Sequence, residues 1–283
     1  MESAAEYTRR LMKSGARAYK SMGQNFLISD KVIENIVSAS LLEGDIPLVE
    51  IGPGLGILTR VLAAEVKKMW AVELDRNKIE ILKKELKGLP VEILNRDALE
   101  LDLHELWGDQ KGYLIGNLPY YITSPLIMHF LEQVDSLKGM TIMVQKEVAD
   151  RIMASSGSKK YGVLSIAVQL SAQVTKVTDV MPNSFWPEPK VNSTVIRLDL
   201  RPYRGFDDID KKDFFRIVKA AFSQRRKTMG NSLSSGLGLA KEEVSKCMNA
   251  VGIAQDRRAE SLNIEEFQIL TKAFLNCNLL KPS

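Results

Sequence analysis

The sequence has little of the chemistry that metal and disulfide sites require. It contains two cysteines and two histidines in 283 residues. Cys247 and Cys277 lack the spacing of metal ligands, and two histidines are too few for a histidine-based site. We therefore predict no metal site, and we interpret both cysteines as free thiols of a cytoplasmic protein.

Long apolar runs are also missing. No stretch approaches the roughly 20 apolar residues of a membrane span, and the first residues lack the apolar core of a secretory signal. We therefore expect no membrane partner. The basic residues near the N-terminus are Arg9, Arg10, Lys13, Arg17 and Lys20. We interpret them as an arm that touches nucleic acid, and a solvated, mobile end is the alternative.

The net charge is small but unevenly distributed. Residues 1–200 carry 24 Lys and Arg against 25 Asp and Glu, whereas residues 201–283 carry 15 against 10. The cationic excess therefore lies in the C-terminal part, which suggests a polyanionic partner there.

Short apolar runs alternate with helical patterns between about residues 30 and 150. The runs predicted as buried strands are Leu48–Ile51, Met69–Leu74, Val91–Leu94, Tyr113–Ile115 and Thr141–Val144. Segments between them, such as Leu58–Ala64 and Lys78–Leu86, have helical periodicity. This alternation predicts a doubly wound, Rossmann-like α/β fold with a mostly parallel sheet.

The rest of the chain has a different pattern. Two β-rich runs, Ser165–Val177 and Ser193–Leu200, follow without a helix-length crossover, and we expect them to form an antiparallel edge hairpin with a long connection. Residues 201–205 have the composition of a linker, and helical patterns then cover Lys211–Ser223, Lys241–Ala250 and Ile264–Leu275. We predict an α/β domain over residues 1–204 and a small all-helical domain over residues 205–283.

A glycine-rich turn follows the first predicted strand. Glycines such as Gly52 and Gly54 let the backbone approach a ligand closely, and the next helix offers free N–H groups at its start. The spacing is G-x-G-x-G, whereas a dinucleotide site normally has G-x-G-x-x-G. A methyl donor fits this turn better than a nicotinamide cofactor, because its methionine part carries no phosphate.

Acidic residues follow the next two strands. Glu73 lies 17 residues after the last glycine of the turn, where it can accept hydrogen bonds from both ribose hydroxyls. Asp97 follows the third strand and can accept from an adenine amine. Each acid alone is more often a helix cap or a solvated loop residue, but their position at successive strand ends favours a nucleoside site.

The tetrad Asn117-Leu118-Pro119-Tyr120 follows the fourth strand. The exocyclic amine of adenine is a poor nucleophile, because its lone pair is delocalised into the ring. The Asn117 amide oxygen and a nearby backbone carbonyl can accept its two hydrogens and aim the lone pair at a methyl group. Pro119 stiffens the turn, and Tyr120 can stack on a flipped base. In isolation, the tetrad would be an ordinary turn.

These segments resemble the ribosomal RNA adenine dimethyltransferases of the kasugamycin-resistance type. The shared motifs are Gly23-Gln24-Asn25-Phe26-Leu27, the glycine turn, Glu73, Asp97, the Asn-Leu-Pro-Tyr tetrad, Phe185-x-Pro-x-Pro-Lys190-Val191 and residues 221–228, Ala-Phe-Ser-Gln-Arg-Arg-Lys-Thr. In this order they span nearly the whole chain and are highly specific.

The resemblance implies S-adenosyl-L-methionine as the methyl donor. It implies that Asn25 and Leu27 contact the donor near its methionine end, and that Gly52, Glu73, Asp97 and Asn117 line the same pocket. It further implies two methyl groups on each of two adjacent adenosines near the 3′ end of small-subunit ribosomal RNA, within a ribosomal subunit or its precursor. We expect the enzyme to be a monomer.

Two further features have more than one interpretation. Phe185, in a proline-stiffened loop, can form a second aromatic face of the base pocket, or it can be a loop anchor buried in the core. Arg225, Arg226 and Lys227 end a predicted amphipathic helix. They suit phosphate contacts, although a basic helix end is often no more than a complement to the helix dipole.

Two alternative functions remain. Large-subunit adenine methyltransferases of the macrolide-resistance type share the glycine turn and the tetrad, but the basic segment at residues 225–227 and Arg258-Ala259-Glu260-x-Leu262 favour the small-subunit type. A non-catalytic ribosome assembly factor is the alternative from another class, and the intact tetrad with both acids argues against it.

Overall fold

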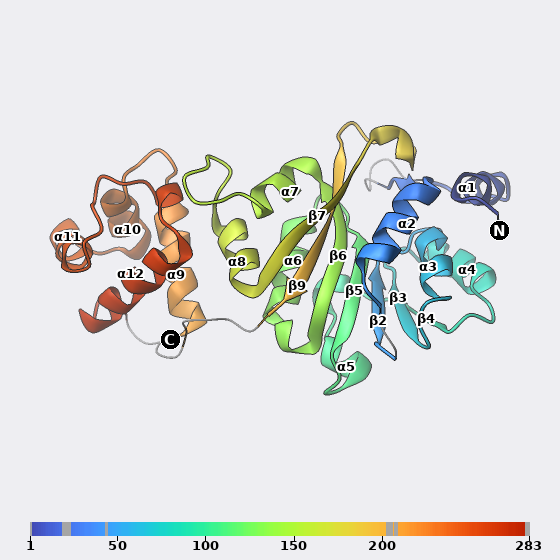
Figure 1. Cartoon of the computed structure of the whole chain (residues 1–283), viewed down its shortest axis with the longest axis horizontal. Coiled ribbons are helices and arrows are strands. Elements are labelled where there is room, and N and C mark those ends of the chain that lie inside the picture. Colours follow the sequence, from blue (N-terminus) through green and yellow to red (C-terminus); the bar gives the residue numbers. More distant parts are fainter. Residues whose placement is uncertain (1, 19–23, 43–44, 202–205, 207–208, 281–283) are drawn as a thin grey trace. The chain divides into compact units, whose positions relative to one another are not determined.

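The computed structural model describes residues 2–18, 24–42, 45–201, 206 and 209–280. The chain divides into two compact units (Figure 1). The first, called here the sheet unit, comprises residues 1–149 and 172–201, and the second, the helical unit, comprises residues 150–171 and 202–283. This division differs from the predicted one in two places, because residues 150–171 belong to the helical unit and the later boundary lies after residue 201 instead of residue 204.

A seven-stranded sheet with the order β4-β3-β2-β5-β6-β9-β7 forms the centre of the sheet unit. Its strands are β2 (Leu48–Ile51), β3 (Met69–Val72), β4 (Val91–Leu94), β5 (Gly112–Asn117), β6 (Leu137–Gln145), β7 (Ala172–Val180) and β9 (Ser193–Leu200). Strands β4, β3, β2, β5 and β6 are parallel, whereas β9 is antiparallel to β6 and β7 is antiparallel to β9. The predicted doubly wound fold is therefore confirmed.

Helices pack against both faces of this sheet (Figure 1). They are α1 (Ala4–Lys13), α2 (Asp30–Ala39), α3 (Ile57–Leu62), α4 (Arg76–Glu85), α5 (Leu103–Trp107) and α6 (Thr123–Glu132), with short 3-10 turns η2 (Ala98–Glu100), η3 (Val134–Ser136) and η4 (Pro182–Ser184). Strands β2 and β3 are buried at every position. Burial on both faces explains why β3 is a continuous apolar run and why β2 is apolar at every position except Glu50.

The order of the strands reverses beside β2. From β2 the chain passes to β3 and then β4, and it returns to β5 on the other side of β2. The connections from β2 and from β5 therefore leave the sheet in opposite directions, and a crevice opens at the carboxyl ends of these two strands. This crevice is where the topology places a ligand.

Arg9, Arg10 and Lys13 of the basic N-terminal segment belong to helix α1. A capping box closes the first turn of α1, and Tyr7 and Leu11 are buried in the core of the sheet unit. Arg9, Lys13 and Arg17 are exposed, Arg10 forms ion pairs, and Lys20 lies outside the described residues.

The first part of the predicted strand Ser165–Val177 is wrong. Residues Val163–Ser171 form helix α8, and β7 begins at Ala172. Periodicity cannot separate a buried helix from a buried strand in such an apolar run. Ile166 and Val168 point to nearly opposite sides of helix α8, and both are fully buried. The helix is therefore buried on opposite sides, which removes the usual amphipathic pattern from the sequence. The remainder is confirmed, since β7 and β9 form the expected antiparallel edge pair.

The helical unit has its own apolar core. Its helices are α8, α9 (Lys211–Phe222), α10 (Met229–Leu237), α11 (Lys241–Ala250) and α12 (Ile264–Asn276), with the short turn η5 (Ala259–Ser261), and α7 (Lys146–Ile152) crosses from one unit into the other. Tyr161, Ile166 and Leu170 pack into the same cluster as Phe214 and Phe267. This packing explains why residues 150–171 join the helical unit. Of the predicted linker, Arg201 alone is described.

Among the described residues, no helix has the length and apolar character needed to cross a membrane.

Candidate active site

The crevice at the carboxyl ends of β2 and β5 contains a cavity of about 350 Å³. Every residue predicted to bind the methyl donor lines it, namely Asn25, Leu27, Gly52, Gly54, Glu73, Asp97 and Asn117. Leu118, Pro119 and Tyr120 of the tetrad line it as well. The structure therefore brings together residues from five separate segments of the chain.

The glycine turn forms one wall of the cavity. Gly52 and Gly54 have φ angles of +70° and +60°, a left-handed conformation that residues with a Cβ rarely adopt. A Cβ on Gly54 would lie 3.2 Å from the Phe26 ring. Both the backbone conformation and this close approach therefore require glycine at position 54.

Glu73 connects the end of β3 to the glycine turn. Its Oε2 accepts from the backbone N–H of Gly54 at 3.2 Å, and its Oε1 accepts from those of Leu74 and Asp75 at 3.0 Å each. The side chain is 8% exposed. Three backbone donors thus hold a buried carboxylate at the cavity wall in one orientation.

Asp75 and Asp97 follow β3 and β4 and serve as helix caps. Asp75 accepts from the N–H of Asn77 at 3.0 Å, and Asp97 accepts from that of Leu99 at 2.9 Å. In both residues the cap uses Oδ1, so the capping role that sequence alone allowed is present. Capping occupies one carboxylate oxygen and is compatible with a ligand on the other.

Asn117 ends β5, and its orientation is set by the N-terminal segment. Its Nδ2 donates to the carbonyl oxygen of Asn25 at 3.3 Å. The next peptide is also held, because the backbone N–H of Leu118 donates to the carbonyl oxygen of Met143 at 3.1 Å. The amide nitrogen is therefore used within the protein, which leaves Oδ1 as the acceptor for a substrate amine.

The second half of the tetrad is fixed in a similar way. Thr123 Oγ1 donates to the carbonyl oxygen of Pro119 at 2.9 Å, and the Tyr120 hydroxyl lies 2.7 Å from Ser193 Oγ. Burial raises the pKa of Tyr120, which the hydrogen bond with Ser193 partly offsets. Tyr120 is thus a neutral ring anchored at its far end, which suits a stacking surface.

Sequence reasoning missed Glu50, a carboxylate inside strand β2. It lines the cavity and is 2% exposed, and its Oε2 has no hydrogen-bond partner among the described residues. Burial raises the pKa of Glu50 to about 8, and the charge of Glu73 adds to the effect. The available signal was an acid between Val49 and Ile51 in an otherwise apolar strand.

Lys78 of α4 was missed too. It is 6% exposed and lines the cavity, with Nζ 3.9 Å from Asp75 Oδ2 and 5.5 Å from the centre of the Phe26 ring. Burial lowers its pKa, and the charges of Glu73 and Asp75 oppose this. A lysine in a helical pattern gives no sequence signal of burial.

Phe185 does not line the cavity. It is 1% exposed and belongs to the core of the sheet unit. Strand β8 (Phe185–Trp186) pairs with β1 (Phe26–Leu27), with Phe185 opposite Leu27. The structure therefore places Phe185 as a buried anchor, the alternative considered from sequence, and its ladder holds Leu27 at the cavity.

The basic residues Arg225, Arg226 and Lys227 lie in the helical unit. All three are exposed in the connection between α9 and α10, because α9 ends earlier, at Phe222. Arg225 donates to the carbonyl oxygen of Lys159. They are therefore cations on a surface loop and not the end of a helix.

No group of three or more metal-ligating side chains occurs in the part of the chain that the structure describes. The cavity lining consists of backbone groups, carboxylates, amides, two basic side chains, aromatic rings and aliphatic side chains.

Comparisons with known proteins identify the family. The family described as "Ribosomal RNA adenine dimethylase" matches residues 15–274. Ribosomal RNA small subunit methyltransferase A of Desulfitobacterium hafniense is 62% identical over 97% of this chain and 99% of its own length. The protein of that name from Clostridioides difficile is 45% identical over 89% of each chain.

Solved structures agree on the fold. A dimethyladenosine transferase from Plasmodium falciparum aligns with a TM-score of 0.74 at 24% identity, over 89% of this chain and 98% of its own. The 23S rRNA methyltransferase ErmE aligns with a TM-score of 0.67 at 24% identity, over 88% and 99%. Together, the match over most of the chain and the close curated relatives show that this protein belongs to the ribosomal RNA adenine dimethylase family.

Proposed function

We propose that this protein transfers methyl groups from S-adenosyl-L-methionine to N6 of two adjacent adenosines near the 3′ end of small-subunit ribosomal RNA. Family membership and the 62% identical small-subunit methyltransferase support the substrate. The observation that carries the chemistry is Asn117, whose amide nitrogen is held by Asn25 inside a cavity that Glu73 and Asp97 also line.

The residues of the cavity fit the proposed methyl donor. Glu73 and Asp97 supply acceptors for ribose hydroxyls and an adenine amine, and the backbone at Gly52 and Gly54 leaves room that side chains would fill. Asn25 and Leu27 form the wall for the methionine part. When bound, the donor supplies an electrophilic methyl group on a positively charged sulfur.

Asn117 is the residue that prepares the nucleophile. Its Oδ1 accepts one hydrogen of the adenine amine, and a neighbouring backbone carbonyl accepts the other. The Pro119 carbonyl already accepts from the Thr123 hydroxyl at 2.9 Å and from the Ile122 N–H at 3.2 Å, so we expect another backbone carbonyl of the tetrad to take this role. Both acceptors draw the amine toward a tetrahedral geometry with its lone pair free. A strong base is unnecessary, since the methylated ammonium is very acidic.

Tyr120 positions the base. A target adenine must leave its stack to reach such a cavity, and a flipped base is commonly held on an aromatic side chain. The contact between the Tyr120 hydroxyl and Ser193 fixes the ring plane before the base arrives. Phe185 contributes indirectly, through the β1–β8 ladder that holds Leu27. The tetrad therefore combines amine orientation with base stacking.

The helical unit supplies RNA contacts in this proposal. A pocket for one adenine reads little of the surrounding sequence, so selection of one ribosomal site must depend on shape and phosphate contacts elsewhere. Arg225, Arg226 and Lys227 are exposed and densely spaced. We assign them to phosphate contacts with the ribosomal subunit or its precursor, bound by a monomeric enzyme in the cytoplasm.

The test is transfer of labelled methyl groups to ribosomal subunits from cells that lack this protein, with mapping of the modified nucleotides. We expect dimethylation of two adjacent adenosines near the 3′ end of the small-subunit RNA. Methylation of large-subunit RNA would instead indicate the macrolide-resistance type. Binding to subunits without any transfer would indicate an assembly factor, and either result would overturn the proposal.

A further inference from the structure

The N-terminal helix reaches the glycine turn through one buried hydrogen bond. The Tyr7 hydroxyl on α1 donates to the carbonyl oxygen of Leu55 at 3.0 Å. Tyr7 is 1% exposed, and Leu55 lies between Gly54 and Gly56 at the cavity wall. Burial raises the pKa of Tyr7, with the charge of Glu85 adding to it, so its hydroxyl remains a donor at physiological pH.

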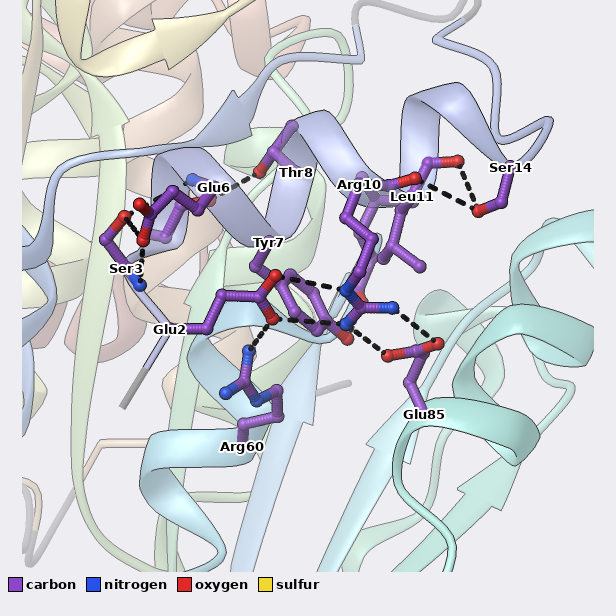
Figure 2. A network of polar contacts seen from close by, with 12 residues as sticks. Glu2, Ser3, Glu6, Tyr7, Thr8, Arg10, Leu11, Ser14, Arg60 and Glu85 are labelled. Carbon is purple, nitrogen blue, oxygen red and sulfur yellow. Dashed lines mark hydrogen bonds and ion pairs between the residues drawn. The ribbon is translucent and has the colours of Figure 1, made fainter.

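Charged side chains hold the Tyr7 ring in place (Figure 2). The guanidinium carbons of Arg10 and Arg60 lie 5.0 Å and 4.2 Å from the ring centre. Arg10 pairs with Glu85 of α4 at 2.8 Å and with Glu2 at 3.1 Å, and Arg60 lies 3.9 Å from Glu2. Arg60 belongs to α3, the helix that the glycine turn starts. The tyrosine is thus fixed to both helices that flank the turn.

A second part of the N-terminal segment contacts the same turn. The ring of Phe26 in β1 packs so closely on Gly54 that a Cβ there would lie 3.2 Å from it. Tyr7 therefore holds Leu55 by a hydrogen bond, and Phe26 packs against the neighbouring residue Gly54. Three residues of this turn, Gly52, Gly54 and Gly56, have positive φ angles, so few local preferences fix its shape.

We propose that Tyr7 is a positioning residue for methyl-donor binding, acting through the carbonyl of Leu55 to hold the glycine turn in its binding conformation. This inference rests on the proposed function, because it presumes that the cavity takes S-adenosylmethionine. The apparent Kd of a ligand is its intrinsic Kd divided by the fraction of molecules whose turn can accept it. Removal of the hydroxyl leaves the Leu55 carbonyl without this buried donor and lowers that fraction.

The experiment measures binding of S-adenosylhomocysteine, the product of the methyl donor, by calorimetry. Tyr7→Phe keeps the ring between Arg10 and Arg60 and removes the hydroxyl alone. The matched control is Tyr113→Phe, since Tyr113 is 5% exposed and its hydroxyl lies 2.8 Å from Thr141 Oγ1, away from the cavity. Each variant loses one buried tyrosyl hydrogen bond and should be destabilised to a similar extent.

We expect Tyr7→Phe to weaken binding about 3- to 10-fold, the range that one net hydrogen bond supports, and Tyr113→Phe to leave it within about 2-fold. In steady-state kinetics, the KM for the methyl donor should rise in Tyr7→Phe while kcat changes little. Equal affinity in wild type and Tyr7→Phe, or equal weakening in both variants, would overturn the inference. Failure of the wild type to bind S-adenosylhomocysteine would refute the proposed function instead.

Discussion

The sheet unit and the helical unit place their functional charges in opposite ways. In the sheet unit, the carboxylate of Glu73 is buried and held by three backbone N–H groups. In the helical unit, Arg225, Arg226 and Lys227 lie on an exposed connection between helices. The first arrangement fixes geometry at a cost in desolvation, and the second keeps the side chains solvated and adaptable.

From this contrast we expect the sheet unit to serve donor binding and catalysis, and the helical unit to serve RNA binding. A reaction requires groups placed to within a fraction of an ångström, which strand ends and backbone donors provide. Contact with a phosphate backbone tolerates long, movable side chains, because its energy is largely electrostatic. Variants in one unit should therefore change catalysis or donor affinity, and variants in the other should change RNA binding.

The largest effect should come from Asn117→Ala. Loss of the amine acceptor should lower kcat on the order of 100-fold or more, by analogy with the removal of other preorganised polar groups. Affinity for S-adenosylhomocysteine should fall by a few-fold at most, because the variant also loses the hydrogen bond to Asn25. Single-turnover kinetics and calorimetry measure the two separately, and equal losses in rate and affinity would make Asn117 a donor-binding residue only.

Glu73→Gln should act on the donor and not on the reaction step. A charged acceptor for hydroxyls is worth roughly 1.5–3 kcal/mol, so the Kd for S-adenosylhomocysteine should rise about 10- to 100-fold. Glu92→Gln is the matched control, because Glu92 is an exposed glutamate of β4 away from the cavity. Unchanged calorimetric affinity in a folded Glu73→Gln variant would remove Glu73 from the donor site.

Replacement of Arg225, Arg226 and Lys227 by Gln tests the other side of the comparison. Each lost phosphate contact should reduce the salt slope of RNA binding by about 0.7–0.9, while the Kd for S-adenosylhomocysteine stays the same. The matched control replaces the exposed residues Lys219, Lys241 and Lys246 by Gln, which removes the same total charge elsewhere in the helical unit. Similar slopes for the two triple variants would show a general charge effect and no local RNA contact.

Glu50 should affect stability, and the size of its effect should depend on pH. Its pKa is about 8 in the fold against 4.5 for the free group, so its contribution to stability is present below about pH 4.5 and is lost as pH rises toward 8. Glu50→Gln does not titrate. Its melting temperature relative to wild type should rise on the order of 10 °C between pH 5 and pH 8, because wild type loses roughly 3–4 kcal/mol of stability over this range. Parallel melting curves across this range would show that Glu50 is not a buried, protonated acid.

Much of the sheet unit could be predicted from sequence because two signals coincide there. Strands such as β3 and β5 are apolar runs with abrupt polar ends. The polar residues at such strand ends, Glu73, Asp97 and Asn117, are those that we propose for donor binding and catalysis. Parallel strands bring their carboxyl ends to one edge, so motif order along the chain was enough to assemble most of the cavity.

Long-range pairing and burial could not be predicted in the same way. The apolar run at α8 fits a buried strand as well as a helix, and its partners lie in the C-terminal helices. Phe185 becomes a core residue through pairing with β1, and Tyr7 becomes buried through packing of α1. Nothing local in the sequence specifies either contact, and nothing local marks Lys78 as buried.

The β1–β8 ladder has a consequence for how the protein is made. It joins residues 26–27 to residues 185–186, so one wall of the donor cavity is assembled from opposite ends of the sheet unit. A growing chain can form β2 to β5 and the glycine turn well before β8 leaves the ribosome. Leu27 has its pairing partner only after β8 has emerged. The enzyme should therefore acquire full donor affinity late in its own translation, after the strand scaffold is already in place.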